Sequence, residues 1–270
     1  MSRGGHAGRQ VTATPIWRPN ISGLATLGAC ILAWESAIRG GLLDYEYLPA
    51  PSAIIRGAAE VAASGELATA TVQTLEAVFL GWAIAMTAGV SFGLLLGASP
   101  MVRRWSLATI EVLRPMPAVA FIPVALLLFG FSIETELMVI ILPALWPVLV
   151  NTMGGMTGVH ARLADVSRTL QLSRAAMLCK VMLPAALPTV LVGARLSLTL
   201  ALVLAVLAEM VGNPTGLGYA VVTQQQALRP DLMFAYVAVI GLLGLALNAL
   251  LAAVIAVSFP AAAAFDGPRP

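Results

Sequence analysis

Six long runs of apolar residues dominate the chain, and short polar segments separate them. The runs cover residues 21–41, 76–98, 107–130, 137–158, 187–209 and 233–258. A helix that crosses the hydrocarbon core of a bilayer needs about 20 mostly apolar residues. We therefore expect an all-α membrane protein with about six transmembrane helices. The pattern predicts one membrane domain over residues 21–260, with short tails at 1–20 and 261–270.

The charges of the polar segments alternate in sign along the chain. Basic residues collect in the first 20 residues, at Arg103 and Arg104, and between residues 160 and 180, whereas the segments after the first and third runs are mainly acidic. Lysine and arginine are enriched on the cytoplasmic side of membrane proteins. The alternation therefore predicts that both termini lie in the cytoplasm. In the first run, Glu35 and Arg39 stand four residues apart and are expected to pair.

The first connection is too long for a simple turn, and it predicts a helix outside the membrane. Ser52 is the expected N-cap of an amphipathic helix from Ala53 to Ala63. Arg56 and Glu60 stand four residues apart on this helix, which is the spacing of an ion pair.

The second run contains glycines at helical spacing. Gly89, Gly93 and Gly97 fall on one stripe, a pattern that lets two helix backbones approach closely in lipid. The same letters, Gly89-Val90-Ser91-Phe92-Gly93, match the elbow of serine hydrolases. That motif needs a strand–turn–helix context, so packing is the favoured interpretation over an intramembrane hydrolase.

Five residues within the runs are candidates for a translocation path, each with an alternative role. Arg114 and Pro117 flank a break in the third run, and broken backbone at membrane depth is buried or lines a cavity. Arg114 could instead reach the cytoplasmic headgroups, and Asn151 could bond between helices. Arg195 and Glu209 are 14 residues apart on the fifth run, about 21 Å along a helix, so each needs another partner or a wet cavity.

Composition excludes several classes of chemistry. Apolar residues make up 59% of the chain and charged residues 10%, and the net charge of +2 is too small to indicate a nucleic-acid partner. Two distant cysteines and two histidines do not form a metal motif. The single lysine, Lys180, lacks the surroundings of a phosphate-binding loop, so we expect no cofactor on this chain and no ATP hydrolysis by it.

The segment from Leu163 to Pro184 is the most polar stretch between two apolar runs. Leu163, Val166 and Leu170 share one face of a short helix, and Ser173 is expected to begin a second one before the chain re-enters the membrane. A basic amphipathic helix pair can lie on the lipid surface or dock into the groove of a partner.

This segment resembles the EAA loop of ABC-importer permeases. Asp165-Val166-Ser167 stands at the EAA positions, Gln171 at the glycine, and Val181–Pro184 at the closing I-x-L-P. A glycine would allow a left-handed turn, so Gln171 either bears strain or the turn is built differently. The resemblance implies an ATPase-coupling role for the following residues: Asp165, Val166, Ser167, Leu170, Gln171, Leu172, Arg174, Leu183 and Pro184.

A series of further motifs in the same order resembles the permeases of nitrate, sulfonate and taurine importers. The series includes LPAPSAII, GVSFGLLLG, LRPMPAVAFIPVALLLFG, PVLVNTMGGM and AEMVGNPTGLGYAV. The resemblance implies a type I, MetI-like permease of the bacterial inner membrane. It also implies a second copy of the permease, two ABC ATPase subunits that bind ATP, and a periplasmic or lipid-anchored solute-binding protein.

The resemblance leaves the substrate open between a small oxyanion and a thiamine-precursor-like solute. A secondary transporter working without an ATPase is the alternative from another class. Such transporters are built from repeats, and residues 1–135 and 136–270 show no convincing repeat.

Overall fold

The computed structural model is helical over most of the residues that it describes, which are 21–43, 45, 47–158, 171 and 173–259. Over these residues it contains no strand. The chain divides into two compact units, residues 1–53 and residues 54–270, which are described separately.

The first unit contains helix α1 (Ile21–Arg39) and the start of helix α2 (Pro51–Ala63). The predicted pair of Glu35 with Arg39 is confirmed. Ser52 is not the N-cap, because α2 already begins at Pro51, whose missing N–H suits the first helical position. The Ser52 N–H instead donates to Glu35 Oε2 at 2.9 Å, and its hydroxyl accepts from Arg39 at 3.0 Å.

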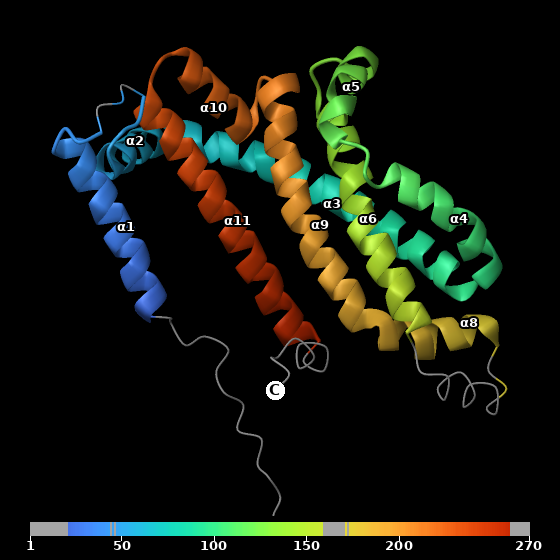
Figure 1. The fold of residues 1–270 in the computed structure, drawn as a ribbon. Helices are drawn as coiled ribbons and strands as arrows, with labels where there is room; N and C mark the ends of the chain where they lie inside the picture. Colours follow the sequence, from blue (N-terminus) through green and yellow to red (C-terminus); the bar gives the residue numbers. More distant parts are fainter. Residues whose placement is uncertain (1–20, 44, 46, 159–170, 172, 260–270) are drawn as a thin grey trace, which may run out of the picture. The chain divides into compact units, whose positions relative to one another are not determined.

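In the second unit, three long helices pack against one another and form the core: α3 (Glu66–Ala98), α6 (Ile133–Thr157) and α9 (Leu183–Gly212). Helix α11 (Pro230–Ser258) lies against α9 (Figure 1). Alanine and β-branched residues fill the centre, so the helix axes come close together. The central cluster includes Ala77, Val78, Val139, Ile140, Ala201 and Ala205.

The predicted glycine stripe of α3 is in contact with α6. A Cβ atom built on Gly89, Gly93 or Gly97 would come within 2.5–2.7 Å of an α6 side chain. Gly81 lies about two helical turns before Gly89 on α3 and outside the predicted stripe. A Cβ atom built on Gly81 would likewise collide with the Ile140 side chain of α6. The α6 partners of the three predicted glycines are Val148, Thr152 and Met156.

The third apolar run is not one straight span. It forms α4 (Pro100–Leu113), a short 3₁₀ helix at Ala118–Phe121 and α5 (Ile122–Phe129), and the two halves are bent by 82°. Five helices of the described residues are long and apolar enough to cross a membrane, or six if the bent pair counts as one span.

The helices also extend beyond the predicted runs. Helix α3 starts at Glu66, ten residues before the run at 76–98. The segment after α9, which no apolar run covers, contains helix α10 (Gly216–Gln226). Before α9, a single turn of helix, α8 (Arg174–Met177), continues through a π-helical turn at Leu178–Met182.

Candidate functional site

The turn between α9 and α10 is held by polar side chains of α3. The N–H of Gly216 donates to Gln73 Oε1 at 3.1 Å, and the N–H of Leu217 donates to Thr74 Oγ1 at 2.9 Å. The first N–H groups of a helix have no partner within it, so these side chains supply the missing acceptors for α10. Thr74 is fully buried, and the contact therefore lies in the interior of the second unit.

Two buried carboxylates complete this connection. Glu209 of α9 is 2% exposed and accepts from the N–H of Gly218 at 2.7 Å. Glu136 of α6 is 3% exposed and accepts from the side-chain amide of Asn213. A carboxylate near a helix N-terminus is stabilised by the helix dipole, so the start of α10 gives Glu209 a favourable interaction. We call Gln73, Thr74, Glu136, Glu209, Asn213 and Gly216–Gly218 the outer-loop cluster, after the side of the membrane that the charge pattern predicts for this loop.

Glycine is required at two positions of the outer-loop cluster. Gly216 has a φ of +88°, which L-residues rarely adopt, and a side chain there would collide with the Glu209 carboxylate. A Cβ atom on Gly218 would collide with the Val206 carbonyl. The close approach of α10 to α9 therefore depends on these glycines.

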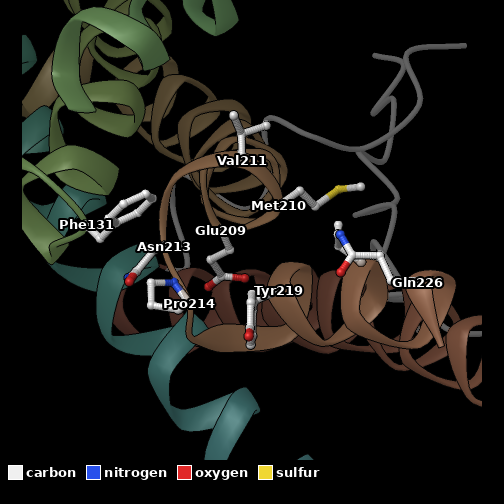
Figure 2. Close-up of a pocket in the computed structure, with 9 residues that line it drawn as sticks. Phe131, Glu209, Met210, Val211, Asn213, Pro214, Tyr219 and Gln226 are labelled. Carbon is white, nitrogen blue, oxygen red and sulfur yellow. The ribbon is translucent and has the colours of Figure 1, made fainter. Parts of the chain in front are cut away.

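A cavity of about 270 Å³ adjoins the outer-loop cluster. Figure 2 shows Phe131, Asn213 and Pro214 on one side of the Glu209 side chain, with Met210 and Gln226 on the other. Among the predicted path residues, only Glu209 lines this cavity. The remaining lining residues are Val211, Tyr219 and Val222.

Arg195 lies far from the outer-loop cluster along α9. Its Nε donates to Asn248 Oδ1 of α11 at 3.0 Å, and Asn248 Nδ2 donates to Thr199 Oγ1 at 3.3 Å. The expectation that Arg195 and Glu209 have separate partners agrees with this geometry. Asn248 is absent from the predicted path residues, although a polar residue in the middle of an apolar run is a signal for such a role.

The other predicted path residues are scattered. Asn151 donates to the Pro147 carbonyl of its own helix at 2.8 Å, so its side-chain amide is used within α6. Arg114 is the C-cap of α4, and Pro117 precedes the 3₁₀ helix, so both stand at the 82° bend and are exposed. Ser91 lies within the continuous helix α3 and donates to the Thr87 carbonyl, so the hydrolase context is absent at this serine.

An ion pair in the second unit joins Glu60 of α2 to Arg229, which directly precedes α11. Arg229 donates to both oxygens of Glu60 at 3.0 and 3.2 Å and to Asp231 at 3.2 Å. These hydrogen bonds, first to Glu60 and then to Asp231, raise the pKa of the Arg229 guanidinium above its ordinary value. Arg229 lies 169 residues after Glu60 in the sequence. The four-residue spacing of Arg56 and Glu60 therefore does not predict this partner.

Most of the predicted coupling segment lies outside the described residues. This applies to Asp165, Val166, Ser167, Leu170 and Leu172. Within the described part, Gln171 has a φ of +51°, so the left-handed turn is made without glycine and bears the strain. Ser173 caps α8 by accepting from the Ala176 N–H at 3.2 Å, as expected. Helix α8 begins at Arg174, and Leu183 and Pro184 begin α9.

A family profile decides the identity of this membrane-helical chain. Residues 86–262 match the profile of the binding-protein-dependent transport system inner membrane component. The chain belongs to this family. It is the permease component of an ABC importer, and the expected resemblance is confirmed. Membership implies an ATPase partner and a solute-binding partner.

Related permeases share most of the chain length. A putative aliphatic sulfonates transport permease, SsuC of Bacillus subtilis (strain 168), is 32% identical over 83% of this chain and 81% of its own length. The taurine transport system permease TauC of Escherichia coli (strain K12) is 28% identical over 90% of both chains. The nitrate import permease NrtB of Leptolyngbya laminosa is 31% identical over 66% of this permease and 63% of its own length.

The fold of the permease is also that of a solved transporter. The inward-facing MetNI methionine ABC transporter matches 70% of this chain and 96% of its own, with a TM-score of 0.58 and 18% identity. At this identity the similarity shows the fold alone. The MetI-like, all-α architecture expected from the sequence is confirmed.

Most of the outer-loop cluster is not predicted by the sequence pattern. The charge pattern puts Glu136 in an external connection, whereas it is buried in the first turn of α6. Gln73 and Thr74 precede the second apolar run, in a segment that the structure makes part of α3. The sequence does contain one signal of the close approach between α9 and α10, namely the two glycines at positions 216 and 218.

Proposed function

We propose that this chain is the permease of an importer for a small oxyanion, such as a sulfonate, taurine or nitrate. The observation that carries the proposal is the similarity to the aliphatic-sulfonate permease SsuC, which extends over 83% of the chain. The names of the taurine and nitrate permeases support the same class of solute. An external solute-binding protein delivers the oxyanion, and the permease carries it across the membrane.

We further propose that two copies of the permease stand on two ATPase subunits. ATP binds to the ATPases, and the permease itself catalyses no reaction. Both termini and the segment 163–184 face the cytoplasm, in agreement with the basic residues there. This segment seats in a cleft of each ATPase and transmits its closure to the membrane helices as a two-state switch.

The proposal is tested with the complete importer reconstituted in proteoliposomes. Uptake of radiolabelled taurine, ethanesulfonate and nitrate is compared with uptake of a thiamine precursor, each delivered by the partner binding protein. We expect ATP-dependent uptake of at least one oxyanion. Uptake of the thiamine precursor alone would contradict the proposed substrate class.

The coupling role is tested by Asp165→Arg and Leu170→Arg in the same liposomes. We expect at least a tenfold loss of uptake per ATP hydrolysed, with normal amounts of permease in the membrane. Arg103→Glu, a charge reversal in another cytoplasmic connection, serves as the matched control and should keep its coupling. Normal coupling in both segment variants would show that the assignment is wrong.

A further inference from the structure

Arg195, Thr199 and Asn248 form a polar triad at the middle of two apolar helices. The candidate span Lys180–Gly212 places Arg195 15 residues from one end and 17 from the other, about 22 and about 26 Å along the helix. Asn248 is 18 residues from the start of α11 and 10 from its end. The hydrogen bonds of the triad therefore lie deep within the membrane-spanning region.

The Arg195 side of α9 is turned away from the core of its own chain. Arg195 and Thr199 are exposed, whereas Ala194 and Leu198 beside them are buried. A cation at this depth is costly when it faces lipid, and such residues face a bundle interior or a water-filled cavity. The exposed Arg195 and Thr199, together with the partly buried Asn248, therefore belong on a surface that something other than lipid covers.

Asn248 orients the guanidinium of Arg195. Its Oδ1 accepts from Nε at 3.0 Å, and its amide is in turn held by Thr199, so both ends of the asparagine are fixed. An Nε contact engages one edge of the planar guanidinium and fixes the plane. The Nη1–Nη2 end of a guanidinium is the fork that matches two oxygens of an oxyanion.

We infer that the Arg195–Thr199–Asn248 triad is the point at which the translocation path recognises an oxyanion. The inference rests on the proposed function, because it adds a recognition site to the proposed oxyanion substrate class. Two-fold symmetry would bring the triads of two copies to one shared path, where two like charges attract an anion and repel cations. Arg195 contacts the oxyanion, and Asn248 is a positioning residue.

The inference is tested by thiol labelling of the membrane-embedded permease–ATPase complex. The variant Thr199→Cys is made in a Cys30→Ser, Cys179→Ser background. The probes are two methanethiosulfonates, one carrying ethylsulfonate and one carrying ethyltrimethylammonium, with rates divided by those of a free thiol in solution. We expect the sulfonate probe to react at least tenfold faster, and Arg195→Gln to lower this preference at least fivefold.

Leu250→Cys is the matched control, because Leu250 lies two residues from Asn248 on another side of α11 and is 58% exposed. Facing lipid, it should react with neither probe. No reaction at Thr199→Cys would place the triad against lipid and overturn the inference. Equal rates for the two probes would overturn it as well, since the path would then lack anion preference.

A second variant covers the case in which Arg195→Gln does not assemble. Asn248→Leu keeps the charge but releases the guanidinium, so the preference for the sulfonate probe should fall at least twofold. An unchanged preference would overturn the role of Asn248. If the labelling results hold while no oxyanion is taken up by wild-type proteoliposomes, the proposed substrate fails and the anion-selective triad stands. Oxyanion uptake without labelling would instead overturn the triad and leave the proposed substrate standing.

Discussion

Glu209 shows how a buried carboxyl group can be held by a backbone N–H at the start of a neighbouring helix. One of its oxygens accepts from the Gly218 N–H at 2.7 Å. Gly218 is itself buried. Loss of the carboxylate would therefore leave a polar group unsatisfied in the interior, which costs more than the original bond contributed.

The variant Glu209→Ala should destabilise the purified permease by roughly 1–3 kcal/mol, because it leaves the buried Gly218 N–H without its acceptor. For a domain of this size each kcal/mol lowers Tm by about 2–4 °C. Glu209→Gln keeps an acceptor and should lose less. The measurement is the Tm in detergent, with the exposed Glu111→Ala as control; a Tm for Glu209→Ala equal to that of the control would contradict the role given to Glu209.

Gln171 shows what sequence can and cannot decide about a single residue. The motif predicts a glycine-type turn at this position, and the φ of +51° confirms the turn. Whether the glutamine bears the strain or changes the turn depends on backbone geometry, which no local pattern contains. The burial of Glu136 cannot be predicted for a similar reason, since its partner Asn213 is 77 residues away.

At the scale of elements, apolar runs predict the long helices, and prolines predict the break in the third run. Helix α10 escapes prediction because its sequence, GLGYAVVTQQQ, lacks both a long apolar run and a side-chain N-cap. Its N-terminus is completed by Gln73 and Thr74 from a distant part of the chain. The predicted start of α3 is too late because its first turns are polar and extend beyond the apolar run.

The contact between α3 and α6 predicts opposite effects for two glycine substitutions. Gly93→Ala should destabilise the permease by about 1–3 kcal/mol, because the added methyl group meets Thr152 at 2.5 Å. Gly154→Ala adds the same methyl group to a helix, but nothing lies within 4 Å of it. Helix propensity then favours alanine by up to about 1 kcal/mol.

Thermal unfolding of the two variants in detergent measures this difference directly. Tm should fall for Gly93→Ala and stay level or rise for Gly154→Ala. A Tm for Gly93→Ala at or above the wild-type value would show that the two helices are not in backbone contact at this position.

At the scale of the whole molecule, the alternation of charge predicts the orientation in the membrane. A cysteine introduced by Arg174→Cys should react with an impermeant maleimide only from the cytoplasmic side. One introduced by Glu134→Cys should react only from outside, since Glu134 is exposed at the opposite end of α6 from residue 158. Both are made without the native cysteines.

Labelling of intact cells and of inverted membrane vesicles distinguishes the two sides, and permeabilised cells give the total reactive thiol. The reverse labelling pattern would invert the topology and would move the segment 163–184 to the side where no ATPase can reach it. The membrane spans and the side of each loop can be predicted from the sequence, because local apolarity and charge encode them. The Arg195–Asn248 contact cannot be predicted in this way, because it joins residues 53 positions apart.

The close contact of α3 with α6 also bears on how these helices can move relative to one another. Helices separated by side chains can slip past one another, but interlocked backbones cannot slide without first moving apart. Trp82 of α3 and Ser197 of α9 extend the interlock by bonding to the Ala194 and Ala144 carbonyls. A rearrangement that slid α3, α6 and α9 past one another would therefore have to break these two hydrogen bonds and open the glycine contacts.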